Sequence, residues 1–264
     1  MVTKKDIAAA LCDLGVKKDR PLLVHSSLSA FGQVDGGADT VIDALSEAVL
    51  PDGTLVMPSF NHGDVYQAGD IYDVKTTKTT NGIIPDTFWR RPGVMRSLAS
   101  THAFAAQGKK AKQYLENHHK TSPMGKGSPI DYMFADDGYV LLLGVDFTAN
   151  SFHHYVEEMM GAPCLSLSDP YPVRDSERNI IHVPTWKWRS AGCPYSDMGG
   201  YRIQMPMYTD VMSRIAQHAQ VGGAGLMLYN MREGFDVISS FFREGGEGFP
   251  PCKYCAIRPT DNWF

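Results

Sequence analysis

The amino-acid sequence predicts an α/β protein with a mixed, largely parallel central sheet flanked by helices, and an antiparallel β portion in its second half. Two short apolar segments, residues 22–25 and 54–57, have the character of buried strands, and residues 37–49 between them place apolar side chains on one face at helical spacing. A strand–helix–strand unit of this kind is parallel and right-handed. The strongest apolar run, residues 139–145, predicts a further buried strand.

The remaining elements follow from caps, breakers and periodicity. Thr3 is suited to cap an N-terminal helix that ends before Gly15. Further helices are predicted at residues 81–90, 111–118, 151–160, 208–219 and 232–244. Strands are predicted at residues 225–229 and, as an antiparallel pair, at residues 180–183 and 184–189.

The chain is predicted to form a single domain over residues 1–264. Residues 59–82 lack clear periodicity and carry several aspartates, among them Asp64, together with Tyr66. A long irregular segment in a compact domain is often a binding loop, so a substrate loop is predicted there. Residues 164–206 are rich in Pro, Trp and Tyr and predict a β-rich insertion.

Composition narrows the function classes. The 264 residues carry 25 Lys and Arg against 29 Asp and Glu, a formal net charge of −4, and 43% are hydrophobic. This composition excludes wholesale disorder, and the mild acidity argues against a nucleic-acid partner. No signal peptide or bilayer-spanning segment is recognised, so the protein is predicted to be cytoplasmic, with no membrane partner. Five cysteines in such a chain favour reduced thiols over a disulfide framework.

Several common catalytic signatures are absent from the sequence. There is no G-x-x-x-x-G-K-[ST], no G-x-G-x-x-G and no G-x-S-x-G. Phosphate-loop NTPases, dinucleotide-binding dehydrogenases and typical serine hydrolases are therefore disfavoured.

The first candidate site follows the strand predicted at residues 22–25. Ser26 and Ser27 offer hydroxyl groups there, and Gly32 precedes the helix predicted at residues 37–49. Hydroxyls and exposed amides beside a helix N-terminus suit a phosphate or a polarised carbonyl oxygen. A polar loop that only caps the helix explains the same residues.

Two further segments are candidates for ligand contacts. His102 lies among small apolar residues, where it is either a satisfied core histidine or part of a site. In residues 121–134, two Ser-Pro pairs flank two glycines, which predicts a rigid loop whose backbone amides a ligand can approach. A plain surface loop has the same composition.

The segment after the strand at residues 139–145 is the strongest candidate, because active-site residues of open α/β sheets collect there. If residues 151–160 are helical, His154 and Glu157 share a face. A carboxylate beside an imidazole fixes its tautomer and raises its basicity. The alternatives are a surface ion pair and a metal site that includes His153. Adjacent helical side chains point about 100° apart, which disfavours the metal site.

Taken together and in this order, these segments resemble the aminoglycoside 3-N-acetyltransferase family. The similarity is dense over about the first 160 residues and looser beyond them. The matching stretches are VHSSLSAFG (24–32), DGTLVMPSF (52–60), RRPGVMRS (90–97), STHAFAA (100–106), SPMGKGSP (122–129), VLLLGVDF (140–147) and NSFHHYVEE (150–158).

The resemblance implies an α/β fold unlike that of the GNAT acetyltransferases, with acetyl-CoA as the acyl donor and no metal needed for catalysis. His154 and Glu157 match the family's His–Glu dyad, although His153 stands where an apolar residue is common. The same match implies that the residues contacting CoA are Ser26, Ser27, Gly32, His102, Phe104, Ser122, Pro123 and Met124.

The chemistry agrees with this assignment. An alkylammonium must lose a proton before its nitrogen can attack a thioester. His154, oriented by Glu157, is expected to take that proton, and the loop after His25 is expected to supply hydrogen-bond donors to the oxyanion. The amine attacks directly, without an acyl-enzyme.

The acceptor is predicted to be a small cationic amine, for which the resemblance implies the 3-amine of a 2-deoxystreptamine aminoglycoside. Asp64, Tyr66 and Glu158 are candidates to bind it. Another amine, such as an aminophosphonate, is the alternative acceptor. Cys252 and Cys255 form a C-x-x-C pair that can bind zinc if two more ligands join it, which is compatible with a zinc-stabilised binding protein without turnover. A homodimer is also compatible with the sequence.

Overall fold

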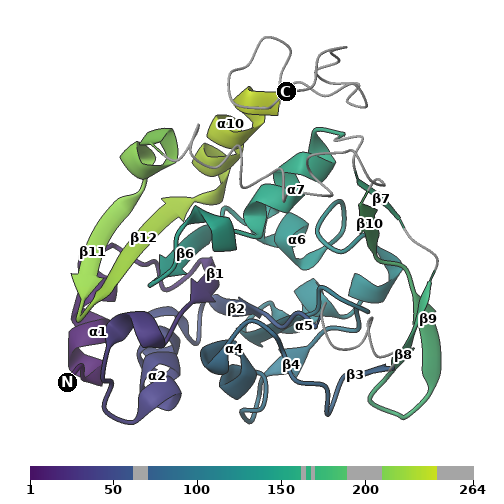
Figure 1. Cartoon of the computed structure of the whole chain (residues 1–264), viewed down its shortest axis with the longest axis horizontal. Coiled ribbons are helices and arrows are strands. Elements are labelled where there is room, and N and C mark those ends of the chain that lie inside the picture. Colours follow the sequence, from purple (N-terminus) through teal and green to yellow (C-terminus); the bar gives the residue numbers. More distant parts are fainter. Residues whose placement is uncertain (62–70, 162–164, 168–169, 189–209, 243–264) are drawn as a thin grey trace.

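The computed structural model describes residues 1–61, 71–161, 165–167, 170–188 and 210–242 (Figure 1). A seven-stranded sheet with strand order β11-β12-β6-β1-β2-β5-β4 forms its centre. At the middle of this sheet, β1 (Pro21–Ser26) lies between β2 (Thr54–Pro58) and β6 (Tyr139–Leu143) and is parallel to both.

The α/β class, the mixed sheet and the flanking helices are as predicted, but the parallel part of the sheet is smaller than predicted. Outside the three middle strands, the described neighbours in this sheet pair antiparallel. On one side these are β5 (Phe104–Gly108) and β4 (Met95–Arg96), and on the other β12 (Ala224–Asn230) and β11 (Gln217–Val221). Short connections join β4 to β5 and β11 to β12, and short connections favour antiparallel pairing over a helical crossover. The pairs β2–β5 and β6–β12 are also antiparallel, although long stretches of chain separate their strands.

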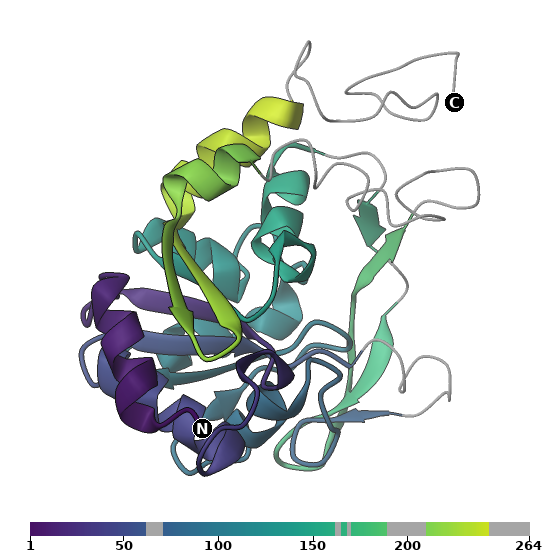
Figure 2. The same cartoon turned by 60° about the vertical axis from the view of Figure 1, so that its left-hand side comes forward.

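Helices cover both faces of the central sheet (Figures 1 and 2). One face carries α1 (Lys4–Asp13), α2 (Gly37–Val49) and α4 (Ile83–Phe88). The other carries α5 (Ala111–Leu115), α6 (Pro129–Ala135), α7 (Phe152–Met159) and α10 (Met231–Phe242). Single turns of 3₁₀ helix are η1 (Ser29–Phe31), η2 (His118–Lys120) and η3 (Phe147–Ala149).

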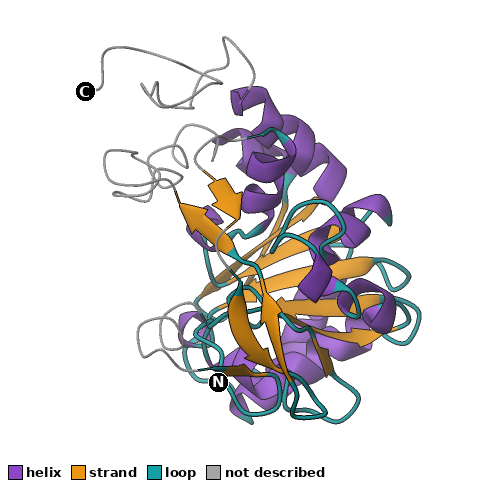
Figure 3. Ribbon diagram, turned by 90° about the vertical axis from the view of Figure 1, so that its right-hand side faces the viewer, coloured by secondary structure: helices purple, strands orange, loops and turns teal. Residues whose placement is uncertain are grey.

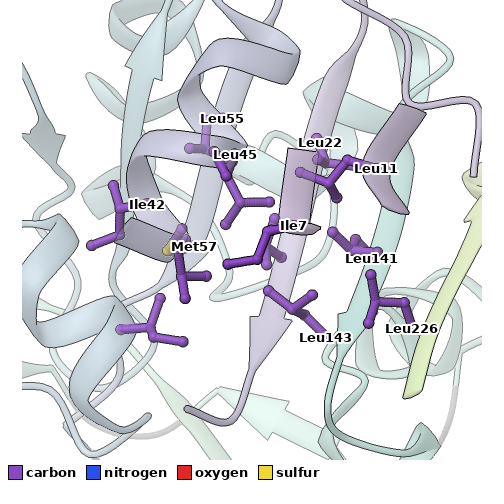
Figure 4. Packing of buried hydrophobic residues seen from close by; sticks show 14 of the residues in the cluster. Ile7, Leu11, Leu22, Ile42, Leu45, Leu55, Met57, Leu141, Leu143 and Leu226 are labelled. Atoms are coloured by element: carbon purple, nitrogen blue, oxygen red, sulfur yellow. The ribbon is translucent and has the colours of Figure 1, made fainter. Parts of the chain in front are cut away.

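The apolar runs of the middle strands are explained by this double covering. Leu22 and Leu141 belong to the cluster under α1 and α2, to which Leu45 of α2 also belongs (Figure 4). Leu23 and Val140, one position along, belong to the cluster on the opposite face. Since successive strand side chains point to opposite faces, a strand covered on both sides must be apolar at every position. Each buried leucine or valine contributes roughly 1.5–3 kcal/mol.

The first helix begins and ends as predicted. Thr3 Oγ1 accepts the backbone N–H of Asp6, and the Asp6 carboxylate accepts the backbone N–H of Thr3 at 2.9 Å. Gly15 follows with φ +76°, a conformation that glycine adopts without strain. The helices predicted at residues 81–90, 111–118 and 151–160 are confirmed in shorter form as α4, α5 and α7.

The helix predicted over residues 208–219 is wrong at its C-terminal end. Residues 210–215 are helical, but Gln217–Val221 form β11, which pairs antiparallel with β12. The turn between these strands consists of Gly222 and Gly223, with Gly222 at φ +57°. Two glycines supply the backbone that a two-residue hairpin requires, so pairing with β12 overrides the local helical pattern.

The second β region stands to one side of the central sheet (Figure 3). It contains a sheet of β3 (Tyr72–Asp73), β8 (Tyr171–Arg174) and β9 (Ile180–Val183), and a pair of β7 (Leu165–Leu167) and β10 (Trp186–Trp188). The strand at residues 180–183 is confirmed, but its predicted pairing with the next segment is wrong. Since β9 pairs with β8 and β10 with β7, the chain passes from one sheet to the other at Pro184, which has no N–H for a ladder.

The described part of the 164–206 segment is rich in strands, and residues 189–206 lie outside the description. Of the 59–82 segment, residues 62–70 lie outside it. None of the helices in the described ranges is long and apolar enough to cross a membrane.

Candidate active site

A cavity of about 210 Å³ lies at the carboxyl ends of β1, β2 and β6. The end of β1 contributes His25 and Ser26, and the segment after β2 contributes Phe60. The segment after β6, residues 145–151, and the first turns of α7 with His154 complete this wall. The carboxyl ends of parallel strands are where open α/β sheets bind ligands, so this cavity is the candidate active site.

The helix α7 presents a histidine and a carboxylate together at this cavity. His154 Nδ1 donates a hydrogen bond to Glu157 Oε2 at 2.5 Å. The His154 side chain is 18% exposed, whereas that of Glu157 is 0% exposed. The three-residue spacing on a helix brings the two side chains to one face, and burial leaves the carboxylate behind the imidazole.

The Glu157 carboxylate also binds a second imidazole. His153 Nε2 donates to Glu157 Oε1 at 3.0 Å, and His153 is fully buried. Burial by itself raises the pKa of the Glu157 carboxyl, but the attraction of His153 and His154 and their hydrogen bonds outweigh it and lower that pKa to about 2. The carboxylate therefore stays ionised at any pH at which the protein works.

His25 lies on the same cavity at the end of β1. Its Nε2 accepts the backbone N–H of Ser151 at 3.3 Å and lies 3.1 Å from Ser151 Oγ. Burial, and the like charge of His154 when both rings are protonated, lower the pKa of His25 to about 3. His25 is thus a neutral imidazole that joins β1 to the start of α7.

Two buried polar atoms that line this cavity have no hydrogen-bond partner among the described residues. They are Ser26 Oγ and Asn150 Nδ2. The oxygen of the Asn150 amide accepts the Tyr229 hydroxyl at 2.9 Å, which directs its nitrogen elsewhere. A buried polar atom without a partner costs about 1–3 kcal/mol, but both atoms are enclosed, so a ligand in this cavity meets them only if the side chains turn toward it.

Comparison with known proteins then decides the family. The profile of the aminoglycoside 3-N-acetyltransferase family matches residues 23–243. The chain belongs to this family. The resemblance drawn from the ordered sequence motifs is confirmed, and with it the assignment of the chain to a family of acetyltransferases.

Individual relatives agree with this assignment. Aminoglycoside N(3)-acetyltransferase IV of Salmonella sp is 38% identical over 179 residues, which cover 65% of this chain and about two thirds (67%) of that protein. Aminoglycoside N(3)-acetyltransferase VII of Streptomyces paromomycinus is 32% identical over 243 residues, 85% of this chain and 82% of that one. The structure of aminoglycoside acetyltransferase AAC(3)-IVa in complex with a gentamicin matches with a TM-score of 0.72 and 28% identity, over 97% of this chain and 96% of that one.

Within this acetyltransferase fold, several residues predicted for the site are brought together. Ser26, His102 and His154 line one cavity although they are far apart in sequence. The ring of His102 packs edge-on against Phe60 with ring centroids 5.0 Å apart, and its Nδ1 lies 2.8 Å from Thr101 Oγ1.

Other predicted donor-site residues do not reach the cavity surface. Ser27 Oγ lies 3.0 Å from Ser29 Oγ, and Gly32 is exposed at the end of η1 with φ +77°. Phe104 and Met124 are fully buried in the core, where Phe104 packs against Phe60 at 5.3 Å between ring centroids. Phe104 thus supports the cavity wall from behind, through Phe60.

Ser122 and Pro123 form a turn beside that wall. Ser122 Oγ accepts the backbone N–H of Gly125 at 2.7 Å, and the carbonyl oxygen of Pro123 accepts His118 Nε2–H at 2.8 Å. Glu158 lies against this turn, since a Cβ added at Gly125 would sit 1.9 Å from Glu158 Oε1. Glu158 follows Glu157 directly in α7, so this turn packs against the dyad helix.

Four predicted residues fall on parts of the chain that the structure does not describe. These are Asp64, Tyr66, Cys252 and Cys255. The described residues contain no group of three or more His, Cys, Asp or Glu side chains arranged to hold a metal ion.

The sequence analysis missed several residues of the cavity, above all His25, Phe60, Asn150 and Ser151. His25 ends the strand predicted at residues 22–25, and Phe60 comes shortly after the strand predicted at residues 54–57. Asn150 and Ser151 lie at the start of the predicted dyad helix, after the strand predicted at residues 139–145. Their position at the carboxyl ends of strands was the available signal.

A larger hollow adjoins the cavity. It measures about 540 Å³ and shares the lining residues Val145, Thr148 and Ala149 with the cavity. Its other side is formed by the β11–β12 hairpin, including His218 and Met227. The two spaces therefore meet at the η3 segment, which contributes to the lining of both.

Proposed function

We propose that the protein transfers the acetyl group of acetyl-CoA to an amine, the 3-amino group of a 2-deoxystreptamine aminoglycoside, with His154 as the general base. The observation that carries this proposal is the 2.5 Å hydrogen bond between His154 Nδ1 and the buried Glu157 carboxylate, at a cavity of an aminoglycoside 3-N-acetyltransferase fold.

The hydrogen bond decides which nitrogen of His154 is the base. A carboxylate only accepts, so the proton of the neutral ring resides on Nδ1 and the lone pair on Nε2. His154 lines the cavity, so Nε2 is the atom that takes a proton from an amine bound there. The charge of Glu157 then stabilises the imidazolium that forms.

The donor side of the proposal rests on the polar groups opposite the dyad. Ser26 and His102 line the same cavity as His154, which supports contacts with the thioester end of acetyl-CoA. Ser27, Gly32, Ser122 and Pro123 are proposed to contact donor atoms farther from the reacting carbon, and Phe104 and Met124 to shape the wall.

The acceptor side is proposed from charge. An aminoglycoside is a polycation, so acidic side chains near the cavity stabilise its binding. Glu158, which follows Glu157 in the dyad helix, is the described candidate, and Asp64 and Tyr66 are proposed to join it. The same cationic chemistry fits other small amines, including an aminophosphonate, and the assay below separates them.

The test measures thiol release from acetyl-CoA with aminoglycosides that carry or lack a 3-amine, with simple polyamines and with an aminophosphonate. Turnover confined to 3-amine aminoglycosides, with the acetyl group located on that nitrogen by NMR, supports the proposal. Turnover with another amine alone replaces the acceptor, and no turnover with any amine overturns the transferase assignment for this chain.

A matched pair of variants tests the base. His154→Ala and His154→Gln are expected to lose thiol release by at least about 10²-fold, the usual contribution of a general base. Their affinity for CoA should remain within a few-fold of the parent, because the substitution does not touch the proposed donor contacts. Full activity in either variant would remove His154 from the mechanism.

A further inference from the structure

We propose that His25 is a further catalytic residue, whose Nδ1–H donates a hydrogen bond to the acetyl carbonyl oxygen as that oxygen becomes an oxyanion. This inference rests on the proposed acetyl transfer. It assigns the oxyanion contact to the last buried residue of β1 rather than to the serine loop that follows it.

The tautomer of His25 is set by a backbone group. The N–H of Ser151 lies 3.3 Å from His25 Nε2, and a backbone N–H can only donate. Nε2 must therefore hold a lone pair, and the single proton of the neutral ring must sit on Nδ1. The hydroxyl of Ser151, 3.1 Å from the same nitrogen, can donate to it as well.

The Nδ1–H of His25 points to the cavity. His25 makes no hydrogen bond through Nδ1 to any described residue. Nδ1 is nevertheless not enclosed, so it is accessible from outside the protein core. The residue is 4% exposed and lines the cavity that His154 also lines. The accessible part of the ring therefore includes Nδ1, and we infer that it opens into this cavity.

The neutral state of His25 suits this role. Its pKa is lowered to about 3, first by burial and then by repulsion from His154. A ring that stays neutral is a donor of constant strength across the working pH range, and it does not compete with His154 for the amine proton. The two histidines of one cavity are thus given different tasks by their surroundings.

The transfer forms a C–N bond and breaks the C–S bond of the thioester. The amine nitrogen forms a bond to the carbonyl carbon, the C=O π pair moves to the oxygen, and His154 Nε2 takes the amine proton. The oxyanion returns its pair to carbon, the C–S bond breaks, and the thiolate of CoA leaves with that bond's electrons. The proton on His154 passes to the thiolate or solvent, whereas His25 keeps its own proton throughout.

The loop after His25 is a weaker source of donors. The backbone N–H of Ser27 is bound to the carbonyl oxygen of Leu143 at 3.0 Å, and the Ser27 hydroxyl lies 3.0 Å from that of Ser29. Ser26 Oγ is a second candidate donor, but a hydroxyl rotates freely whereas the His25 ring is held by Ser151. Preorganised donors are the ones that stabilise a transition state strongly.

Two substitutions separate catalysis from positioning, because His25 also holds Ser151. In His25→Asn the amide nitrogen takes the place of Nδ1, so the donor remains and the bond to Ser151 is lost. In His25→Gln the amide oxygen takes the place of Nε2, so the bond to Ser151 remains and the donor is lost. We expect kcat to fall about 10²- to 10³-fold in His25→Gln with KM within threefold, and to fall less in His25→Asn.

The outcomes are distinct. If kcat falls more in His25→Asn than in His25→Gln, or if His25→Gln keeps the parental kcat, the donor role is overturned. The proposed function stands in that case, because the parent still turns over. A parent without turnover overturns the proposed function instead. A second readout needs no activity: ¹⁵N NMR of histidine-labelled parent, with the His25 signals assigned from their loss in His25→Gln, is expected to show protonated Nδ1. Protonated Nε2 would overturn the proposal.

Discussion

Glu157→Gln tests the dyad through a change of one atom. The carboxylate accepts from His154 at 2.5 Å and from His153 at 3.0 Å, one oxygen for each ring. An amide has one acceptor and one donor group, so both rings stay bonded only if one of them switches tautomer. If His154 switches, its Nε2 carries a proton and cannot act as the base. In either arrangement, the charge opposite the imidazolium is lost.

The size of the effect follows from the structure. The two rings lower the pKa of the Glu157 carboxyl to about 2 against the effect of burial, so its charge interacts strongly with them. Loss of that charge weakens the base that it supports, and a general base contributes at least about 10²-fold. Loss of the productive tautomer adds to this, and in a buried carboxylate–histidine pair it reaches about 10⁴-fold. We therefore expect kcat/KM to fall by about 10²- to 10⁴-fold.

The assay is thiol release from acetyl-CoA at saturating donor. Glu177→Gln, at an exposed site between β8 and β9, is the matched control and should be unchanged. A Glu157→Gln enzyme within threefold of the parent would refute the reasoning. The lowered pKa also means that Glu157 stabilises the fold above pH 4.5 and that this contribution is lost as pH falls toward 2. The variant should therefore lose less stability over that interval in urea unfolding.

Three further predictions concern the turn at Ser122, the packing of a glycine and a buried histidine. Gly125→Ala places a methyl group 1.9 Å from Glu158 Oε1 and 2.7 Å from Ser122 Oγ, so both side chains must move. Both are the ends of side chains, so we expect little change in Tm but an acceptor KM raised about fivefold. An unchanged KM would exclude an acceptor contact by Glu158. Gly53→Ala places its methyl group 2.6–2.8 Å from three backbone carbonyl oxygens, and should lower the free energy of unfolding by about 3 kcal/mol in urea denaturation. Gly225→Ala, whose added methyl group has nothing within 4 Å, is the control and should be nearly neutral. Burial lowers the pKa of His118 to about 4, so on acidification the unfolded chain binds a proton first and stability falls between pH 6.5 and 4. His118→Gln should reduce the slope of unfolding free energy against pH by up to about 1.4 kcal/mol per pH unit in that interval. An equally steep slope in the variant would contradict this.

The elements that sequence reasoning predicted well are those whose signals are local. Thr3 caps α1 through a residue three positions on, and the apolar face of α2 is a property of consecutive turns. The elements it missed depend on distant partners. Gln217–Val221 is a strand because β12 lies beside it, and β5 is held by its pairing with β2. α6 was missed within a segment interpreted as a loop, although Ser128 caps it and Pro129 begins it.

The same distinction applies to the site. Ser26 and His102 could each be singled out from their surroundings in the sequence, but their meeting depends on β5 pairing with β2. That register places Phe104 opposite Pro58, so His102 comes beside Phe60. No local pattern contains this information, because it arises from the order of strands in the sheet.

The sequence by itself determined the family, the middle strands with their crossover helix, and the His154–Glu157 pair, because a three-residue spacing on a helix is enough to join two side chains. Only the tertiary structure decided that Glu157 is enclosed between two imidazoles and that His25 is a neutral ring held by Ser151. Burial and a hydrogen bond between residues 126 positions apart set these states, and both exist only once the sheet and α7 have packed together.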